Sequence, residues 1–376
     1  MRLPGPDRLL INGRFLYARP TGVQRVATAL LQQLGERQDE LRASLPRGVA
    51  VAAPSGDVPA TVAGVPVEQS GRRGGQIWEQ MVLPRVGRGD IILSLANVGP
   101  MATRRGITMI HDAQVYTSPG SYSRAFVTWY RFLLPRLGRR NLQILTVSEF
   151  SKRELVGFGI APADRITVIP NGCDHILAVT PEADAPARWG LRSRGYVAAL
   201  STTQPHKNIA ILLRAFRDGA MGDLRLVLVG KAGAEEMRAA CPDLPDDVIF
   251  TGPVSDGALR GLLEQALCFA MPSTTEGFGL PPLEAMLLGT PAVVAPCGAL
   301  PEVCGDAALY AAPDRAEEWQ ARIGALRDDP TLFARLRAEG REQAGRFTWA
   351  RAGGMLIDTI RRCAQPANRL ESKGSE

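Results

Sequence analysis

The stretch CFAMPSTTEGFGLPPLEAMLLGTPAVVA, residues 268–295, decides the fold. It begins and ends with short apolar runs of strand length, 268–271 and 292–295, and it holds a helix-length apolar segment, 282–288, between them. A strand, a helix and a second strand in this order predict a βαβ unit, in which the helix connects two parallel strands. The chain is therefore expected to contain a parallel sheet covered by helices.

The same alternation runs through most of the chain. Strands are expected at 8–11, 49–53, 90–95, 106–110, 142–147 and 166–169, and again at 196–200, 224–229 and 248–251. Helices are expected near 22–34, 122–137, 149–158, 208–217, 234–240 and 256–266, with a last one near 349–362.

One interruption divides this pattern. Pro170-Asn171-Gly172 signals a turn, and residues 180–190 are rich in Pro and Ala without an apolar period. We therefore predict an α/β protein of two facing, doubly wound parallel-sheet domains with a ligand crevice between them. The expected boundaries are 1–170 and 191–345 for the domains, 171–190 for a hinge, and 346–376 for a C-terminal helix that crosses back to the first domain, with its tail.

Composition narrows the class of protein. A length of 376 residues suits two domains, and 45% hydrophobic with 22% charged residues excludes a disordered or fibrous chain. No window approaches 18 uninterrupted apolar residues, and the opening MRLPGPDRLLING lacks a signal-peptide stretch, so a cytoplasmic location is expected. The six cysteines include no C-x-x-C pair, and we interpret them as small buried hydrophobes.

The net positive charge is confined to the first half of the chain. Residues 1–170 hold 22 Lys and Arg against 12 Asp and Glu, whereas residues 171–376 hold 22 against 26. A basic half favours an anionic partner such as a lipid surface, a phosphorylated acceptor or nucleic acid. A solvated Arg-rich surface accounts for the charge equally well, because only four of the 44 basic residues are lysine.

The loop after the strand at 268–271 carries the strongest sign of chemistry. Gly277 and Gly279 precede a Pro-Pro helix start, and such a loop lets backbone N–H groups approach a phosphate. Glu276 and Glu284 stand eight residues apart, so both carboxylates are expected to point toward one crevice, where they would accept hydrogen bonds from sugar hydroxyls. The alternative is an ordinary Gly-rich turn followed by a helix-start glutamate.

A second loop, within STTQPHKNIAILLRAF (201–216), follows the expected strand at 196–200. Lys207 stands beside His206 where the next helix begins. A cation at a helix N-terminus is unfavourable unless an anion is present, so this pair is suited to phosphate. A surface lysine is the simpler interpretation of the loop alone, but its place in the same sheet as the 274–284 loop favours a shared site.

Two weaker candidates lie in the first half. His111, one of three histidines, follows the expected strand at 106–110, where α/β proteins form ligand sites, although a lone histidine is more often structural. Gly22 ends a loop after the first strand and opens a helix, which makes it a potential anion-binding turn.

Several motifs are absent from the sequence. There is no Asp-x-Asp pair to hold a divalent metal under a diphosphate, and there is no G-x-x-x-x-G-K-[ST] phosphate loop. The Gly277-x-Gly279 element lacks the third glycine of the dinucleotide fingerprint, which disfavours NAD binding. A nucleic-acid partner is also disfavoured, because the aromatic content is 6% and no recognition motif occurs.

Together these stretches resemble the retaining glycosyltransferases of family 4. The E-x7-E element is Glu276-GFGLPPL-Glu284, and the companion loop is His206-Lys207-Asn208, where the family commonly has arginine first. Further family-like stretches are IWEQMVLPRV (77–86), IHD (110–112), LTVSEFSKREL (145–155), VIPNGCDH (168–175), FTGPVSDGAL (250–259) and FTWARAG (347–353). The resemblance covers nearly the whole chain and implies the GT-B fold of two facing Rossmann-like domains.

The resemblance also implies roles for single residues. Lys207, with His206, would stabilise negative charge on the leaving diphosphate without a metal. His111 would lie near the reacting sugar, Glu276 would orient the sugar hydroxyls and Glu284 would bind the ribose. Histidine in place of arginine would weaken diphosphate binding or make it depend on pH. The implied donor-binding set is Gly22, His206, Lys207, Val254, Glu276, Gly277, Phe278, Gly279, Leu280 and Glu284, with no metal or other cofactor.

The substrates follow from the same resemblance, which is strongest to enzymes of bacterial surface polysaccharides. Many of these use GDP-mannose, so we expect mannosyl transfer to a saccharide or polyprenyl-diphosphate-linked acceptor. Another nucleotide-sugar donor such as a UDP-sugar, or a GT-B-fold sugar-nucleotide epimerase, is the alternative. The basic, aromatic helix SRAFVTWYRFLLPRLGRR (123–140) favours docking on an anionic membrane at the inner face of the plasma membrane, and a core helix with an Arg-rich edge is the competing interpretation.

Overall fold

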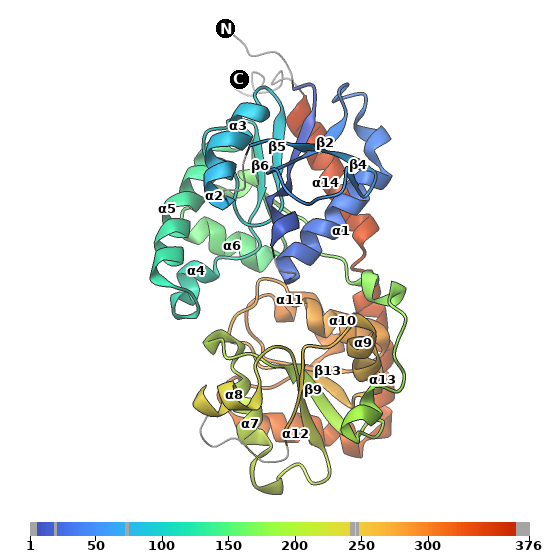
Figure 1. Ribbon diagram of the computed structural model, residues 1–376. Helices are drawn as coiled ribbons and strands as arrows, with labels where there is room; N and C mark the ends of the chain where they lie inside the picture. The colour runs from blue at the N-terminus through green and yellow to red at the C-terminus, as the bar shows by residue number, and fades with distance from the viewer. Residues whose placement is uncertain (1–5, 19–20, 72–74, 241–244, 246–247, 366–376) are drawn as a thin grey trace, which may run out of the picture. The chain divides into compact units, whose positions relative to one another are not determined.

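The computed structural model (Figure 1) describes residues 6–18, 21–71, 75–240, 245 and 248–365. These residues divide into two compact units. Unit 1 comprises the described residues of 1–116, 124–170 and 349–376, and unit 2 comprises those of 117–123 and 171–348. The main boundary therefore falls within the Pro170-Asn171-Gly172 turn.

Unit 1 is built on an eight-stranded sheet with the order β3-β4-β2-β1-β5-β6-β7-β8. Neighbouring strands are parallel except for β3 and β4, which are antiparallel. The strands are β1 (Leu9–Asn12), β2 (Val49–Ala53), β3 (Thr61–Val62), β4 (Val65–Gln69), β5 (Ile91–Ser94), β6 (Gly106–Met109), β7 (Gln143–Thr146) and β8 (Ile166–Val168). The α-helices are α1 (Gly22–Glu36), α2 (Gly75–Ile77), α3 (Leu83–Val86), α5 (Arg124–Arg140), α6 (Glu149–Gly157) and α14 (Trp349–Ala364), with α4 (Gln114–Thr117) at the junction with unit 2.

Burial accounts for the apolar runs in these strands. Leu9, Leu10 and Ile11 of β1 have no exposed surface, as expected where helices cover both faces of a parallel sheet. Helix α1 buries a stripe that includes Leu30 and Leu34 and leaves its other face in solvent. The pattern of the sequence thus matches the packing on both kinds of element.

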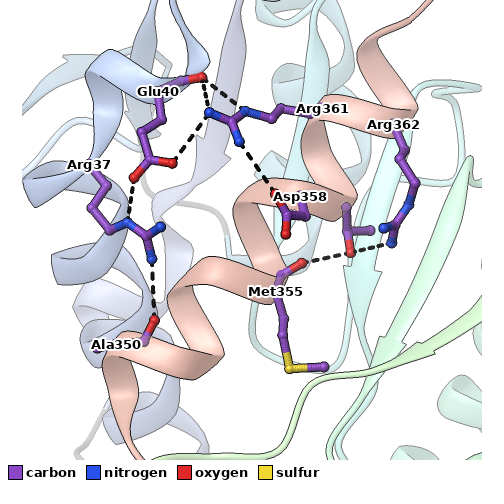
Figure 2. A network of polar contacts seen from close by, with 8 residues as sticks. Arg37, Glu40, Ala350, Met355, Asp358, Arg361 and Arg362 are labelled. Carbon is purple, nitrogen blue, oxygen red and sulfur yellow. Dashed lines mark hydrogen bonds and ion pairs between the residues drawn. The ribbon is translucent and has the colours of Figure 1, made fainter.

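Helix α14 is part of unit 1 although it follows unit 2 in the chain. Its inner face is fully buried at Leu356, Ile357 and Ile360. Figure 2 shows its polar edge, where Nε and Nη2 of Arg361 donate to the carbonyl oxygen of Glu40 at 3.0 and 2.8 Å. At the start of the helix, Nη1 of Arg37 donates to the carbonyl oxygen of Ala350 at 3.2 Å. These contacts attach α14 to the end of α1 and the turn that follows it.

Unit 2 carries a six-stranded parallel sheet with the order β11-β10-β9-β12-β13-β14. Its strands are β9 (Tyr196–Leu200), β10 (Arg225–Val229), β11 (Val248–Gly252), β12 (Cys268–Met271), β13 (Ala292–Val294) and β14 (Leu309–Tyr310). Its helices are α7 (Ile209–Ala215), α8 (Ala234–Ala240), α9 (Asp256–Gln265), α10 (Leu280–Leu288), α11 (Leu300–Cys304), α12 (Ala316–Asp328) and α13 (Pro330–Gly345). The strand order reverses between β9 and β12, and ligands bind at the carboxyl ends of such a pair in α/β sheets.

Residues 171–190, expected as a hinge, are packed within unit 2. They form two 3-10 helices, Asp174–Ala178 and Ala185–Trp189. Ala185 is fully buried, and the backbone N–H of Glu182 donates to the carbonyl oxygen of Gly257 at 3.0 Å. The expected C-terminal tail beyond residue 365 and Cys241 lie outside the described residues.

The five described cysteines are free thiols. Cys173, Cys268 and Cys304 are buried, whereas Cys297 and Cys363 are half-buried. None of the helices in the described part of the chain combines the length and the hydropathy needed to span a bilayer.

Candidate active site

Two loops of unit 2 meet at the carboxyl ends of the adjacent strands β9 and β12. The first ends in the 3-10 helix Pro205–Lys207, and the second leads from β12 into α10. Across them, Nζ of Lys207 donates to Oε1 of Glu276 at 2.7 Å. These side chains are 18% and 8% exposed, so the ion pair is largely shielded from solvent while remaining open to a ligand.

A short network holds the first loop in place. Asn208 adopts the left-handed conformation (φ 53°), which asparagine tolerates better than most residues, and this separates the 3-10 helix from α7. Its Nδ2 donates to the carbonyl oxygen of Pro272 at 3.2 Å. The backbone N–H of Thr274 donates to the carbonyl oxygen of His206 at 2.8 Å. The two loops are therefore joined by backbone and side-chain bonds on both sides of Lys207.

His206 is a buried, neutral group in this site. Its Nδ1 lies 2.8 Å from the hydroxyl of Ser121, which belongs to the segment 117–123 of unit 2. Burial first, and then the neighbouring Lys207 ammonium, lower the pKa of His206. The ring is therefore uncharged at neutral pH. Lys207 supplies the positive charge, and His206 contributes hydrogen bonding where arginine would have added a second cation.

Two glycines shape the loop that carries Glu276. Gly279, directly before α10, has φ +105°, and a Cβ there would lie 2.6 Å from Cδ2 of Leu300. Gly298 has φ +63°, and a Cβ there would lie 2.4 Å from the backbone nitrogen of Glu276. The backbone N–H of Ala299 donates to the carbonyl oxygen of Glu276 at 2.9 Å. The segment after β13 thus supports Glu276 at very close range.

Glu284 lies in the second turn of α10 rather than in its opening turn, because the helix begins at Leu280 and not at 282. Its Oε1 lies 3.0 Å from Nε2 of His175, in the 3-10 helix Asp174–Ala178. The two predicted carboxylates therefore have different partners, since Glu276 pairs with Lys207. Between them, buried Phe278 packs edge-to-face on Phe347 with ring centroids 5.7 Å apart.

The other predicted residues lie at other strand ends. Val254 follows β11 and is half-buried. In unit 1, His111 follows β6 with Nε2 2.9 Å from the carbonyl oxygen of Leu95, and burial lowers its pKa to about 4. The ring is therefore neutral. Gly22 is the exposed first residue of α1. His111 and Gly22 thus belong to unit 1, whereas the Lys207–Glu276 pair belongs to unit 2.

Three polar residues of this region were not anticipated as site residues: Ser121, His175 and Ser273. Ser273, two residues after β12, is buried, and its Oγ has no hydrogen-bond partner among the described residues. A buried hydroxyl without a partner is costly, which marks this position next to the two loops. The VIPNGCDH stretch contained the signal for His175. No local signal connects Ser121 with His206, because 85 positions separate them.

The arrangement brings together the Lys207 ammonium and the Glu276 carboxylate, with Ser273 on the same lining as Lys207. A primary ammonium binds phosphate oxygens, and a carboxylate accepts hydrogen bonds from hydroxyl groups. Among the described residues, no group of three or more His, Cys, Asp or Glu side chains is arranged to hold a metal ion. The Lys207–Glu276 site is therefore suited to a ligand that carries both phosphate and hydroxyl groups.

Comparison with known proteins identifies the family. The Glycosyltransferase Family 4 model matches residues 20–176, and the Glycosyl transferases group 1 model matches residues 193–329. O-antigen chain mannosyltransferase B of Escherichia coli is 32% identical over 282 residues, which cover 70% of this chain and 71% of the relative. The chain belongs to the family 4 glycosyltransferases. It is a hexosyltransferase, and the resemblance described from the sequence is confirmed.

A second relative supports the glycosyltransferase assignment, and a solved structure supports the fold. The MMP alpha-(1->4)-mannosyltransferase of Mycolicibacterium hassiacum is 32% identical over 283 residues, covering 72% of this chain and 67% of the relative. The solved structure of sucrose-phosphate synthase from Thermosynechococcus elongatus has a TM-score of 0.71 at 20% identity and covers 95% of this chain and 98% of that chain. The predicted GT-B fold of two parallel-sheet domains is therefore confirmed.

Proposed function

We propose that this glycosyltransferase transfers mannose from GDP-mannose to a saccharide or lipid-linked saccharide acceptor, with retention of configuration and without a metal ion. The Lys207–Glu276 pair at the switch point of unit 2 carries the proposal, because it combines a phosphate-binding cation with a hydroxyl-binding carboxylate. The choice of mannose is supported by two relatives that are named mannosyltransferases. The choice of GDP rests on the resemblance to enzymes of bacterial surface polysaccharides.

Donor binding would exchange the partners of this ion pair. Without a donor, the Lys207 ammonium and the Glu276 carboxylate neutralise each other at 2.7 Å. With a donor, the ammonium would bind the diphosphate, and the carboxylate would accept hydrogen bonds from mannose hydroxyls. Each group loses one partner and gains another, so neither is left buried and unpaired.

The transfer step would place the acceptor hydroxyl on the face of the sugar from which the diphosphate leaves. The bond from the acceptor oxygen to the anomeric carbon forms while the bond from that carbon to the phosphate oxygen breaks. The acceptor proton passes to the leaving phosphate oxygen, so no side-chain base is required. Lys207 would stabilise the charge that grows on this oxygen, and such a preorganised group contributes about 10²- to 10³-fold in rate.

Two residues would position the donor. Nε2 of His175 lies 3.0 Å from one oxygen of Glu284, and the other carboxylate oxygen would accept hydrogen bonds from the ribose hydroxyls. In unit 1, Nε2–H of His111 donates to the carbonyl oxygen of Leu95, so Nδ1 remains as an acceptor for a hydroxyl of the transferred sugar. His111 would act in this way as a neutral ring, in keeping with its lowered pKa.

A thermal-shift panel of GDP, UDP, ADP and dTDP in the presence of EDTA tests the donor site. A ligand that binds only the folded state raises the unfolding midpoint. We expect GDP to raise it most. A response to UDP alone would replace GDP-mannose by a UDP-sugar, and no response to any nucleotide would contradict the site.

Product analysis tests the reaction. With GDP-mannose and an acceptor, the proposal requires GDP and an α-linked mannoside, whose anomeric configuration is read by NMR. Conversion of the nucleotide-sugar to an epimer in the absence of an acceptor would identify the epimerase alternative.

A further inference from the structure

One surface of unit 1 gathers positive charge beside exposed apolar side chains. We call it the arginine surface and define it as Arg104, Arg136, Arg139, Arg140 and Arg165 with Phe132 and Leu142. Phe132 is 43% exposed and Leu142 is 36% exposed. Phe132 and three of the arginines lie in the second half of α5. Arg104 and Leu142 lie on loops, and Arg165 ends the 3-10 helix Ala163–Arg165.

The arginine surface lies at the amino edge of the sheet of unit 1. Arg104 precedes β6, Leu142 precedes β7 and Arg165 precedes β8, and these three strands are adjacent and parallel. His111 follows β6 and therefore lies at the opposite, carboxyl edge. A strand rises about 3.3 Å per residue, so roughly 20 Å separates Arg104 from His111. The surface is thus distinct from the proposed sugar site.

No carboxylate in the described part of the chain pairs with these five arginines. Backbone carbonyls bind them instead: Arg140 donates to the carbonyl oxygen of Met101 at 2.9 Å, and Arg136 donates to that of Phe132 at 2.6 Å. At the same edge of the sheet, Arg8 shows the opposite arrangement, because Asp90 binds it at 2.8 Å and Glu68 binds it at 2.7 Å. The fold therefore neutralises one arginine at this edge and leaves the others uncompensated.

Two adjoining cavities open between these residues. One, of about 420 Å³, is lined by Met101, Phe132 and three of the arginines. The other, of about 540 Å³, is lined by Arg104, Arg165, the two arginines that it shares with the first, Asn141 and Leu142. Guanidinium groups bind phosphate through paired N–H donors, and a cavity of this size accommodates a phosphate headgroup.

The apolar residues Phe132 and Leu142 distinguish the arginine surface from a surface that binds only soluble phosphates. The ring of Phe132 lies 3.5 Å from the guanidinium carbon of Arg136, so an exposed aromatic face and a cation are presented together. Apolar side chains that stand among arginines fit an anionic bilayer, where the cations bind headgroups and the apolar groups enter the acyl boundary. By contrast, the aromatic residues Phe126 and Tyr130 near the start of α5 stack on each other at 4.0 Å and are half-buried.

We propose that the arginine surface docks this glycosyltransferase on a membrane of anionic phospholipid. The proposal locates the membrane contact at the end of α5 and the neighbouring loops rather than along the aromatic part of the helix. The location of the membrane contact is argued from the arginine surface alone, whereas the reason for docking, access to a lipid-linked acceptor, rests on the proposed function. The docked face of unit 1 would be the amino edge of its sheet, so an acceptor would need a saccharide long enough to reach the carboxyl edge.

Co-sedimentation of the full chain with vesicles tests the proposal. The probes are vesicles of phosphatidylcholine alone and vesicles that also contain phosphatidylglycerol. We expect binding only to the anionic vesicles, with release at high salt. The triple variant Arg104→Gln, Arg139→Gln, Arg140→Gln should bind about 100-fold more weakly, because each basic residue near the surface contributes about fivefold. Phe132→Ser keeps the charge and should weaken binding by roughly tenfold.

A matched triple variant provides the control. Arg124→Gln, Arg153→Gln, Arg351→Gln removes the same charge from exposed helical positions of unit 1 that do not precede a strand, and it should change vesicle binding by less than about tenfold. Equal losses in the two triple variants would overturn the proposal, and so would absence of binding to anionic vesicles at low salt. Tight binding of inorganic pyrophosphate at the arginine surface without vesicle binding would also overturn it in favour of a soluble ligand. The response of each variant to GDP in the thermal-shift assay shows separately whether the donor site is intact.

Discussion

The charged groups at the carboxyl edge of the sheet in unit 2 and those of the arginine surface in unit 1 are held in opposite ways. In unit 2, Lys207 and Glu276 form a shielded ion pair, and His175 contacts Glu284. In unit 1, the arginine surface has no carboxylate partner among the described residues. A paired site keeps its geometry at any salt concentration and exchanges partners with a ligand, whereas unpaired cations act at longer range and are screened by salt.

The largest effect is expected from Lys207→Ala, which removes the cation of the paired site. We expect the rate of transfer to fall about 10²- to 10³-fold, because one preorganised charge-stabilising group is lost. Steady-state kinetics with GDP-mannose would measure the change, and circular dichroism would establish that the fold is kept.

Lys231→Ala is the control for this variant, since Lys231 is an exposed lysine of the same unit. Near-normal turnover of Lys207→Ala, or an equal loss in both variants, would show that the pair is not the site of transfer.

The pH dependence of stability tests whether the buried ring of His111 in unit 1 is neutral. Its pKa is 6.5 for a free ring and about 4 in the folded protein, so the unfolded chain binds the additional proton between these values. Stability is therefore expected to fall as the pH falls from 6.5 toward 4, by an amount on the order of 3 kcal/mol for this group. Urea titrations across this window would measure it.

His111→Gln should flatten this slope, because glutamine does not titrate. Burial raises the pKa of Glu79 in the same unit, and this acts in the opposite direction, so the difference between variant and parent isolates the histidine. An unchanged slope in His111→Gln would mean that the ring is not kept neutral in the folded state.

A smaller effect is expected from Gly298→Ala, which tests how closely Glu276 is supported. The new Cβ would lie 2.4 Å from the backbone nitrogen of Glu276 and would occupy a left-handed conformation, so the loop must shift. We expect a loss of about 1–3 kcal/mol in unfolding free energy and a further loss of transfer beyond that change.

Gly324→Ala is the matched control, because it is expected to raise the free energy of unfolding rather than lower it. Gly324 lies within α12 with nothing within 4 Å of a Cβ, so alanine should stabilise the protein by about 0.5–1 kcal/mol. If Gly298→Ala has the same unfolding free energy and the same rate of transfer as the parent protein, Gly298 does not support Glu276.

The smallest effect is expected from Arg361→Gln, at the polar edge of α14 shown in Figure 2. Its side chain is 35% exposed, so loss of the bonds to Glu40 should cost about 1 kcal/mol or less. The adjacent Arg362 donates to Thr359 within its own helix, and Arg362→Gln should cost less still. A larger loss from Arg362→Gln in thermal unfolding would contradict this ranking.

Much of the fold was predictable because strands and helices leave local patterns. The strands at 49–53, 196–200 and 268–271 match the observed bounds, and the helix expected at 22–34 is observed as Gly22–Glu36. The strands β3, β4 and β14 and the π-helical turn Trp78–Val82 were missed, because such elements are set by their neighbours rather than by an apolar period. The predicted start of α10, residue 282, is two residues later than the observed start at Leu280, because two prolines in the first turn obscure the helical pattern.

The candidate site was also predictable where it depends on local sequence and unpredictable where it depends on contacts between distant segments. Lys207 and Glu276 were expected to lie close together because each follows a strand, and the adjacent parallel strands β9 and β12 do bring them into contact, although their role stays a prediction. The Ser121–His206 and His175–Glu284 contacts were not foreseen, because they join distant segments through side chains alone. The neutral state of His206 followed from burial, which the sequence did not reveal.

The return of α14 to unit 1 limits how the gene can be divided. A fragment that ends at residue 170 would contain every strand of the first sheet but would lack the helix that buries Leu356, Ile357 and Ile360, so the apolar surface beneath it would face water. Such a fragment is expected to aggregate, whereas a fusion that joins residue 170 to residue 349 through a flexible linker should restore the missing cover. Isolation of the basic half for vesicle or crystallisation work therefore calls for two pieces of the coding sequence rather than one.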